Sequence, residues 1–162
     1  TLTEQLSCIG HDSTILRRLR VRYSIPTNRS YEEAAVSNRA IISTPSAPQA
    51  IGPYSQGIKV GNTVWISGQI PLDPNTMSLI SGDITAESEQ VFANLSAVAA
   101  AAGGTLDDAV KINISLTDLA DFEAVNAVMA QQLAEPYPAR ACVQVAALPK
   151  GARIEIEAIL TL

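Results

Sequence analysis

Alternation of polar and apolar residues near the end of the chain is the feature that most restricts its fold. The segment YPARACVQVAALPKGARIEIEA, Tyr137 to Ala158, holds two such runs, separated by LPKG. A period of two is typical of β-strands that lie half-buried in a sheet. The polar positions hold Arg140, Cys142, Glu155 and Glu157, which are not the residues usual on an open sheet surface. The two runs therefore predict strands whose polar side chains face something other than bulk water.

The sequence from Ile41 onward predicts the elements that precede these strands. STPSAPQAIGPYSQG is rich in proline and glycine and predicts a loop, and GIKVGNTVWISGQ predicts two short strands joined at Gly-Asn in a hairpin. An amphipathic helix follows, for which Thr85 is the predicted cap and Glu87 and Glu89 suit the first turn. Its apolar stripe is Val91, Leu95, Val98 and Ala102, and Gly103-Gly104 is the predicted end.

Another strand and another helix complete the set. In DAVKINISL, Val110, Ile112, Ile114 and Leu116 alternate with Lys111, Asn113 and Ser115, as expected of a strand. DLADFEAVNAVMAQQLA predicts a helix with Asp118 as N-cap, Asp121 in the first turn and Pro136 as the stop. The order strand, strand, helix, strand, helix, strand, strand predicts an α+β fold, a single mixed sheet with two helices on one face.

The face of the sheet opposite the helices needs a partner of its own. The alternation predicts that this face carries Lys111, Asn113 and Ser115, then Arg140, Cys142 and Gln144, then Arg153, Glu155 and Glu157. Each residue alone would suit a solvated face, but cysteine with short serine and asparagine side chains favours a closely approached surface. We therefore expect this face to meet another copy of the chain in a closed symmetric oligomer.

Charge divides the chain into two parts. Residues 1–40 hold six basic and four acidic residues, and residues 41–162 hold five basic and twelve acidic, a net charge of −7. An acidic domain repels phosphate backbones, which disfavours nucleic acid and anionic membrane partners. We assign residues 1–40 to an N-terminal extension, either poorly ordered or targeting-like, and residues 41–162 to the folded domain. The arginine cluster RRLRVR favours a targeting peptide, whereas Glu4, Asp12, Glu32 and Glu33 oppose it.

Cysteine and histidine usage excludes several kinds of site. Cys8 and Cys142 are far apart and predict neither a disulfide framework nor a metal site, which favours a reducing compartment. The only histidine, His11, lies in the extension, so the domain has no Ser-His-Asp triad and no histidine-built metal site. No apolar run approaches the ~18 residues of a membrane span. We expect a cytoplasmic protein, or a mitochondrial or plastid one if residues 1–40 are a transit segment.

Four motifs together resemble the RidA family, also called the YjgF family. They are IGPYSQG, ISGQIP, PARACV and ALPKGARIEIEA, and the resemblance runs from about Ile42 to Leu162. It implies a chorismate mutase-like fold and a homotrimer with a central barrel and sites at the subunit interfaces. It also implies cofactor-independent hydrolysis of 2-imino acids and their enamine tautomers to 2-keto acids and ammonia. We expect no cofactor, no metal ion and no nucleic acid or membrane partner.

The resemblance assigns the principal chemistry to two residues. Arg140 is expected to bind the substrate carboxylate, for which a planar guanidinium offers two parallel donors. Glu155 matches the catalytic position, where a carboxylate would deprotonate water and return a proton to the leaving nitrogen. Glu157 lies two residues further along the same strand and is the alternative for that role, although it could equally pair with a cation lining the oligomer.

Further substrate-binding residues follow from the same motifs. Tyr54 of GPYSQ is expected to wall the site, or merely to anchor its loop, and Ser67 and Gly68 of ISGQ would let a ligand approach the backbone. Cys142 matches the pocket cysteine of the family motif PARSC, although Ala141 precedes it where the family often has serine, and we expect an un-ionised thiol and no nucleophile. Asn126 would bring an amide to the rim, or be an ordinary exposed helix residue.

Two questions stay open at this level. If the last two strands form a hairpin, Arg140 and Glu155 are on the order of 20 Å apart at ~3.3 Å per residue. Either the strands are not partners, or the working pair is completed across subunits. The alternative functions are an RNA-cleaving translation inhibitor and a non-catalytic, chaperone-like module that binds small carboxylates.

Overall fold

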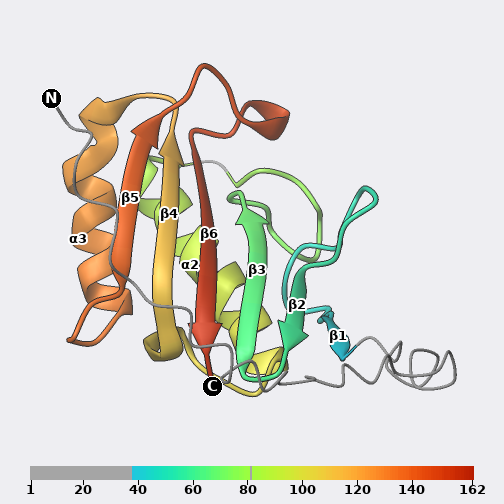
Figure 1. Cartoon of the computed structure of the whole chain (residues 1–162). Coiled ribbons are helices and arrows are strands. Elements are labelled where there is room, and N and C mark those ends of the chain that lie inside the picture. The colour runs from blue at the N-terminus through green and yellow to red at the C-terminus, as the bar shows by residue number, and fades with distance from the viewer. Residues whose placement is uncertain (1–37, 81) are drawn as a thin grey trace, which may run out of the picture. The chain divides into compact units, whose positions relative to one another are not determined.

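Six strands form a single sheet in the computed structural model, which describes residues 38–80 and 82–162 (Figure 1). The strands are β1 Arg39–Ile42, β2 Gly57–Val60, β3 Thr63–Gln69, β4 Ala109–Leu116, β5 Ala139–Gln144 and β6 Ile154–Thr161. Their order across the sheet is β1-β2-β3-β6-β4-β5. Only β4 and β5 run parallel, and every other neighbouring pair is antiparallel, so the sheet is mixed.

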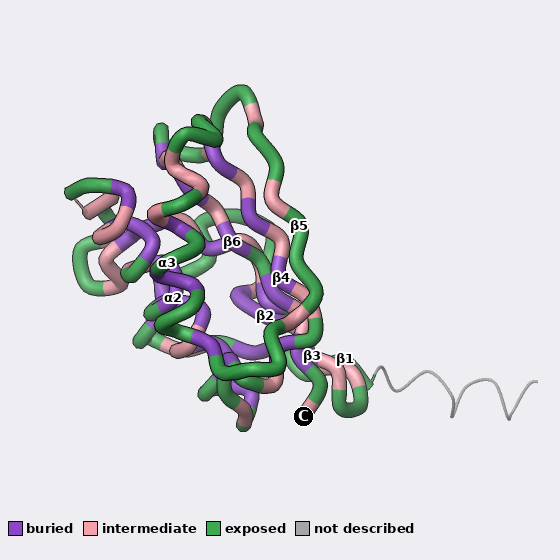
Figure 2. The backbone as a smooth tube through the Cα atoms, turned by 90° about the vertical axis from the view of Figure 1, so that its left-hand side faces the viewer, coloured by how far each residue is buried: buried purple, intermediate pink, exposed green. Residues whose placement is uncertain are grey.

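Two helices, α2 Ile84–Ala101 and α3 Phe122–Gln132, lie on the same face of this sheet (Figure 2). Helix α3 is part of the crossover that joins β4 to the parallel strand β5, since parallel strands cannot be joined by a tight hairpin. The predicted α+β fold, with one mixed sheet and two helices on one side, is confirmed. No helix of the described residues is long and apolar enough to cross a membrane.

The core lies between the helices and the covered face of the sheet. The predicted stripe residues Val91, Leu95 and Val98 of α2 are fully buried, and so are Ile112 of β4 and Ile156 of β6. Burial of each such side chain contributes about 1.5–3 kcal/mol of transfer free energy. The apolar residues of the alternating patterns in β4 and β6 therefore determine which face of each strand is covered by the helices.

Strand β1 was not predicted. It is a four-residue edge strand whose Arg39 pairs with Val60 of β2, and it begins inside the segment assigned to the extension. Three of its four residues are exposed, so it carries no alternating pattern from which a strand could be predicted. The predictions made for Cys8, His11 and the arginine cluster concern residues outside those that the structure describes.

The predicted cap of α2 was wrong by two residues. Asp83 is the N-cap, and its carboxylate accepts a hydrogen bond from the backbone N–H of Ala86 at 2.9 Å. Thr85 lies within the first turn, because aspartate two residues earlier already satisfies a free N–H group of the helix start. The end was predicted correctly: the helix stops at Ala101, and Gly103 follows with a φ of 90°.

The start of β4 also departs from the predicted alternation. Val110 is exposed instead of facing the core, and Ala109 is buried in its place. The pairing with β6 shifts between Ala109, opposite Leu160, and Lys111, opposite Ile159, so one extra residue is inserted. Such a bulge turns the extra side chain outward and restores the pattern from Ile112 onward.

Helix α3 begins in two steps. Asp118 caps a 3₁₀ turn, Leu119–Asp121, by accepting a hydrogen bond from the N–H of Ala120 at 2.9 Å, and α3 continues from Phe122. The helix ends at Gln132, and Leu133 is already extended. Asp118 is therefore a cap as predicted, but of the preceding turn, and the helix stops before it reaches Pro136.

Candidate functional site

The last two strands are not hairpin partners. Strand β4 lies between them, pairing in parallel with β5 and antiparallel with β6. Ser115 of β4 is level with both Glu155 and Val143, and Arg140 lies three residues before Val143. At a rise of ~3.3 Å per residue and a strand spacing of ~4.8 Å, the Cα atoms of Arg140 and Glu155 are about 14 Å apart.

The two residues also point to opposite faces of the sheet, contrary to the prediction. Directly paired residues share a face, and Arg140 pairs with the core residue Ile112, whereas Glu155 pairs with Ser115. Cys142 and Gln144 pair with Ile114 and Leu116, so they too lie on the side of the helices. The polar alternation of β5 was assigned to the wrong face because the period of a strand does not specify which face is covered.

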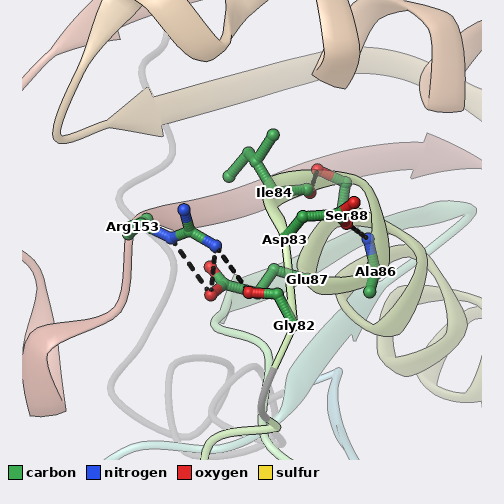
Figure 3. A network of polar contacts seen from close by, with 7 residues as sticks. All are labelled: Gly82, Asp83, Ile84, Ala86, Glu87, Ser88 and Arg153. Atoms are coloured by element: carbon green, nitrogen blue, oxygen red, sulfur yellow. Dashed lines mark hydrogen bonds and ion pairs between the residues drawn. The ribbon is translucent and has the colours of Figure 1, made fainter.

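Arg153 likewise does not join the outer face. It lies just before β6, where the strand alternation no longer applies, and it turns toward the start of α2 (Figure 3). There its guanidinium forms an ion pair of 2.8 Å with Glu87. The outer face therefore carries Lys111, Asn113, Ser115, Glu155 and Glu157 from the predicted set.

Glu155 lies in a hollow of about 410 Å³. The side chains and backbone that line this space come from the loop before β2, the end of β3, the turn before β6 and β6 itself. They are Tyr54, Ser67, Gly68, Ile70, Pro149, Glu155 and Glu157. Four predicted site residues, Tyr54, Ser67, Gly68 and Glu155, are thus brought together, and we call this group the glutamate half-site.

The two carboxylates of this half-site differ in their surroundings. Glu157 is exposed, and its Oε1 accepts a hydrogen bond of 2.7 Å from the amide of Asn113. Glu155 is half-buried, and its carboxylate has no hydrogen-bond partner among the described residues. Burial raises the pKa of Glu155, and the negative charge of Glu157 raises it further. A carboxyl group with a raised pKa and no protein partner is available to exchange protons with water or substrate.

A bulge in β3 makes room for Glu155. Ile66 pairs with Ala158 and Gln69 with Ile156, so Ser67 and Gly68 together face the single residue between those partners. The Glu155 carboxylate lies against Gly68, where a Cβ atom would overlap Oε1. Glycine at this position therefore allows the close approach of Glu155, while the predicted approach of a ligand to this stretch of backbone stays a prediction.

The loop that carries Tyr54 is held by a buried glutamine. Gln56, of which 3% is exposed, exchanges hydrogen bonds with Thr44 and donates to the carbonyls of Ala47 and Pro48. The hydroxyl of Ser67 donates to the carbonyl of Ser55 at 2.6 Å, which joins this loop to the bulge. The tyrosine and the glutamate are thus fixed on one framework.

Arg140 and Asn126 form a second group, which we call the arginine half-site. They line a space of about 440 Å³ together with Met129, Ala130, Tyr137 and Pro138. Arg140 Nη1 donates to Asn126 Oδ1 at 2.6 Å, and the guanidinium carbon lies 5.1 Å from the centre of the Phe122 ring. Among the described residues only Nη1 is engaged, so Nε and Nη2 remain available to a carboxylate.

Cys142 packs beside this group against the core. Burial raises the pKa of its thiol, although the charge of Arg140 acts in the opposite direction. The thiol therefore stays protonated near neutral pH, as expected for a packing residue and not for a nucleophile.

Several lining residues were not predicted. Ile70 and Pro149 wall the glutamate half-site, while Met129 and Tyr137 wall the arginine half-site. Ile70 and Pro149 belong to the motifs ISGQIP and ALPKGARIEIEA, and Tyr137 directly precedes PARACV, so neighbouring sequence could have indicated them. Within the described residues, no group of three or more His, Cys, Asp or Glu side chains could hold a metal ion.

Comparison with known proteins links both half-sites to one family. Residues 44–162 match the family model described as endoribonuclease L-PSP. A 2-iminobutanoate/2-iminopropanoate deaminase of Dermatophagoides farinae is 49% identical over 127 residues, which cover 78% of this chain and 99% of the relative. The human protein of the same name is 48% identical over 121 residues, 75% of this chain and 88% of the relative.

A solved structure agrees with these relatives. The crystal structure of RidA from an Antarctic Psychrobacter is 58% identical in sequence and superposes with a TM-score of 0.74. The match covers 76% of this chain and 99% of that one. All described strands and helices beyond β1 fall within the family match, so the similarity extends over both half-sites.

Proposed function

This chain belongs to the endoribonuclease L-PSP family, the RidA family of the sequence resemblance, and from that premise we propose that it is a hydrolytic deaminase of 2-imino acids. The products are a 2-keto acid and ammonia, and enamine tautomers enter the reaction as imines. One observation carries the proposal: a half-buried carboxylate of raised pKa without a protein partner, in a chain that also presents a guanidinium with free donors. The relatives named as 2-iminobutanoate/2-iminopropanoate deaminases support it.

The roles follow from the chemistry of the substrate, a carboxylate beside an electrophilic C=N carbon. Arg140 binds the carboxylate through its free donors and so orients the imine carbon. Glu155 removes a proton from a water molecule as the water oxygen forms a bond to that carbon. Glu155 passes this proton to the imine nitrogen, which gives the neutral carbinolamine. Glu155 then transfers the hydroxyl proton of the carbinolamine to the same nitrogen, the C=O bond forms as the C–N bond breaks, and ammonia leaves. No electrons are exchanged, so the step needs no redox partner.

The site is assembled from two copies of the chain. Within one copy, Arg140 and Glu155 lie about 14 Å apart on opposite faces of the sheet, too far to hold one small substrate. A neighbouring copy brings its arginine half-site against the glutamate half-site, and a closed ring of three such contacts gives a homotrimer.

An apolar row on the outer face of the sheet supports this assembly. Ile41, Ile58, Trp65 and Ile159 are paired in sequence across β1, β2, β3 and β6. Within this row the side chain of Ile41 is 72% exposed and that of Trp65 is 44% exposed, so the row presents apolar surface to water. A partner that covers the row would remove this apolar surface from water.

Neither alternative function is favoured. The family description names an endoribonuclease, but residues 41–162 contain no histidine and carry a net charge of −7, which opposes phosphate binding. A module that only binds small carboxylates gains nothing from Glu155, because a second negative charge repels the ligand. Catalysis accounts for both charged residues.

We also propose a cytoplasmic location. Cys142 is a free cysteine in the described residues, which is typical of a reducing compartment. Fractionation of cells that produce the full chain would test this, and recovery in a mitochondrial or plastid fraction would support the targeting interpretation of residues 1–40.

The activity is tested by generating 2-iminopropionate in situ with an amino-acid oxidase and following its decay. We expect the protein to accelerate decay and ammonia release.

Glu155→Gln should lower kcat by on the order of 10² while pyruvate still binds, because the amide cannot take a proton. Arg140→Lys should lower kcat/KM at least roughly tenfold through loss of the planar fork. Decay at the same rate with and without the protein would refute the proposal.

A further inference from the structure

Arg153 holds the start of β6 against the first turn of α2 (Figure 3). Its Nε and Nη2 atoms donate to Glu87 Oε1 at 3.1 and 2.8 Å, and Nη2 also donates to the carbonyl of Gly82 at 3.0 Å. The backbone carbonyl of Arg153 in turn accepts from the N–H of Thr117, just beyond β4. One residue thus connects the end of the sheet to the start of the helix.

Stability alone does not account for Glu87. Its side chain is only 12% exposed, and its second oxygen, Oε2, is buried without a hydrogen-bond partner among the described residues. Removing a carboxylate from water costs free energy that a single ion pair offsets incompletely, and an apolar replacement is often neutral or stabilising. The helix start favours a negative charge, but that contribution is small. A buried, half-satisfied carboxylate at this position therefore points to a role beyond holding the fold.

The pair acts at a part of β6 that is paired with only one neighbouring strand. The pairing of β3 with β6 ends at Gln69 and Ile156, because β3 itself ends at Gln69. Ile154 and Glu155 consequently pair with β4 alone, through Leu116 and Ser115. Just before this stretch, Arg153 adds a polar connection to the start of α2 through Glu87 and Gly82.

Glu155 depends on its backbone for its position. Its carboxylate has no hydrogen bond to the described residues and lies against Gly68. A shift of the β6 start would therefore move the carboxylate with it, since no hydrogen bond to the described residues holds the carboxylate in place.

We infer that Glu87 and Arg153 are a positioning pair that aligns the Glu155 carboxylate with the imine carbon. The inference rests on the proposed function, because it assigns the pair to the same proton-transferring residue. The pair touches no substrate. Its effect is on the placement of Glu155, and a displacement on the order of 1 Å costs up to about 10²-fold in rate.

The test compares kcat and KM for imine decay in Glu87→Gln, Arg153→Met and the double variant of the full chain. We expect each single variant to lower kcat about tenfold with KM nearly unchanged, because Arg140 still binds the carboxylate. The double variant should be no slower than the worse single variant, since one interaction is lost in all three. Arg153→Lys should recover part of the loss by keeping one charged donor.

Lys59→Met is the matched control. Lys59 donates to the carbonyl of Ala102 at 3.1 Å and so joins β2 to the other end of α2. This variant removes a comparable connection to the same helix but should keep the kcat of the parent. All rates are measured below the onset of thermal unfolding of each variant.

Three results would overturn the inference. They are an unchanged kcat in both single variants, a rise in KM without a fall in kcat, or an equal fall in Lys59→Met, which would indicate general loosening of α2. If the parent protein itself fails to hydrolyse the imine, the proposed function fails and the positioning role fails with it. The same assay distinguishes this outcome from the three above, in which the parent protein is active.

Discussion

Glu155 is destabilised as a carboxylate by the fold around it. Partial burial and the nearby charge of Glu157 both favour its protonated form and raise its pKa. A general base with a raised pKa is a better proton acceptor when ionised, and at neutral pH it can also return the proton. Holding the ionised Glu155 carboxylate in this place costs folding free energy. In the proposed mechanism the same raised pKa makes Glu155 a better proton acceptor.

This cost should be visible as a pH-dependent stability difference. Because the folded pKa of Glu155 is raised, its stabilising contribution is fully present below the ordinary glutamate pKa and is lost as the pH rises through the folded value. Glu155→Gln does not titrate, so it should gain stability relative to the parent between acidic and neutral pH. Thermal unfolding of both proteins across this range measures the gain. A difference in melting temperature that is constant with pH would show that the pKa of Glu155 is not raised.

The sequence separated these carboxylates only through a resemblance. Glu155 and Glu157 occupy equivalent positions in an alternating pattern, and no rule of spacing distinguishes them. Their difference comes from Asn113, which binds Glu157, and from the bulge that covers Glu155. Both neighbours belong to other strands, so the distinction depends on the strand order of the sheet.

At the scale of the elements, the bulge in β3 and the start of β6 together determine the space around the Glu155 carboxylate. The bulge places Gly68 against the Glu155 carboxylate, and β3 ends one residue later, at Gln69. The bulge thus opens space for the carboxylate, and the end of β3 leaves the start of β6 paired with β4 alone. Bulges are frequent next to active sites because they redirect side chains in this manner.

Gly68→Ala tests this arrangement. The added Cβ would overlap the end of the Glu155 side chain, which can swing away, so we expect the fold to survive and kcat to fall on the order of tenfold. Circular dichroism and imine decay measure the two effects. Gly52→Ala is the control, since its Cβ would meet the Tyr54 ring at an ordinary 3.5 Å and should leave the rate unchanged. Full activity of Gly68→Ala would mean that the carboxylate need not lie against residue 68.

Element types were predicted better than faces. The apolar periods of α2, β4 and β6 identified the core except at Val110, because burial acts on each element by itself. The face of β5 depended on its register with β4, and a shift by one residue exchanges the two faces. The predicted polar face therefore included Arg140 in error, and the edge strand β1 left no pattern at all.

At the scale of the whole molecule, the two half-sites lie on opposite faces of one sheet. We propose that each active site combines the arginine half-site of one copy with the glutamate half-site of another. In the proposed mechanism the arginine half-site binds the substrate and the glutamate half-site performs the proton transfer, but neither reaches the other within its own chain. A site of this kind requires association, so activity and oligomeric state should be inseparable. The exposed row from Ile41 to Ile159 would supply apolar surface for that contact.

Mixing two inactive variants tests this division directly. Arg140→Ala lacks the binding half and Glu155→Gln lacks the catalytic half, so each homotrimer should be inactive. In a trimer that contains both chains, one contact joins an intact arginine to an intact glutamate. Random reassembly of equal amounts should therefore restore about a quarter of the parental sites.

The two variants are unfolded and refolded together, and ammonia release is compared with that of each variant refolded alone, while light scattering reports the mass of the assembly. Recovery requires that the two residues act across an interface, because a site built within one chain would stay inactive in every mixture. Trimers that form but recover no activity would place both residues in the same chain's site, and a monomeric protein with full activity would refute the shared site.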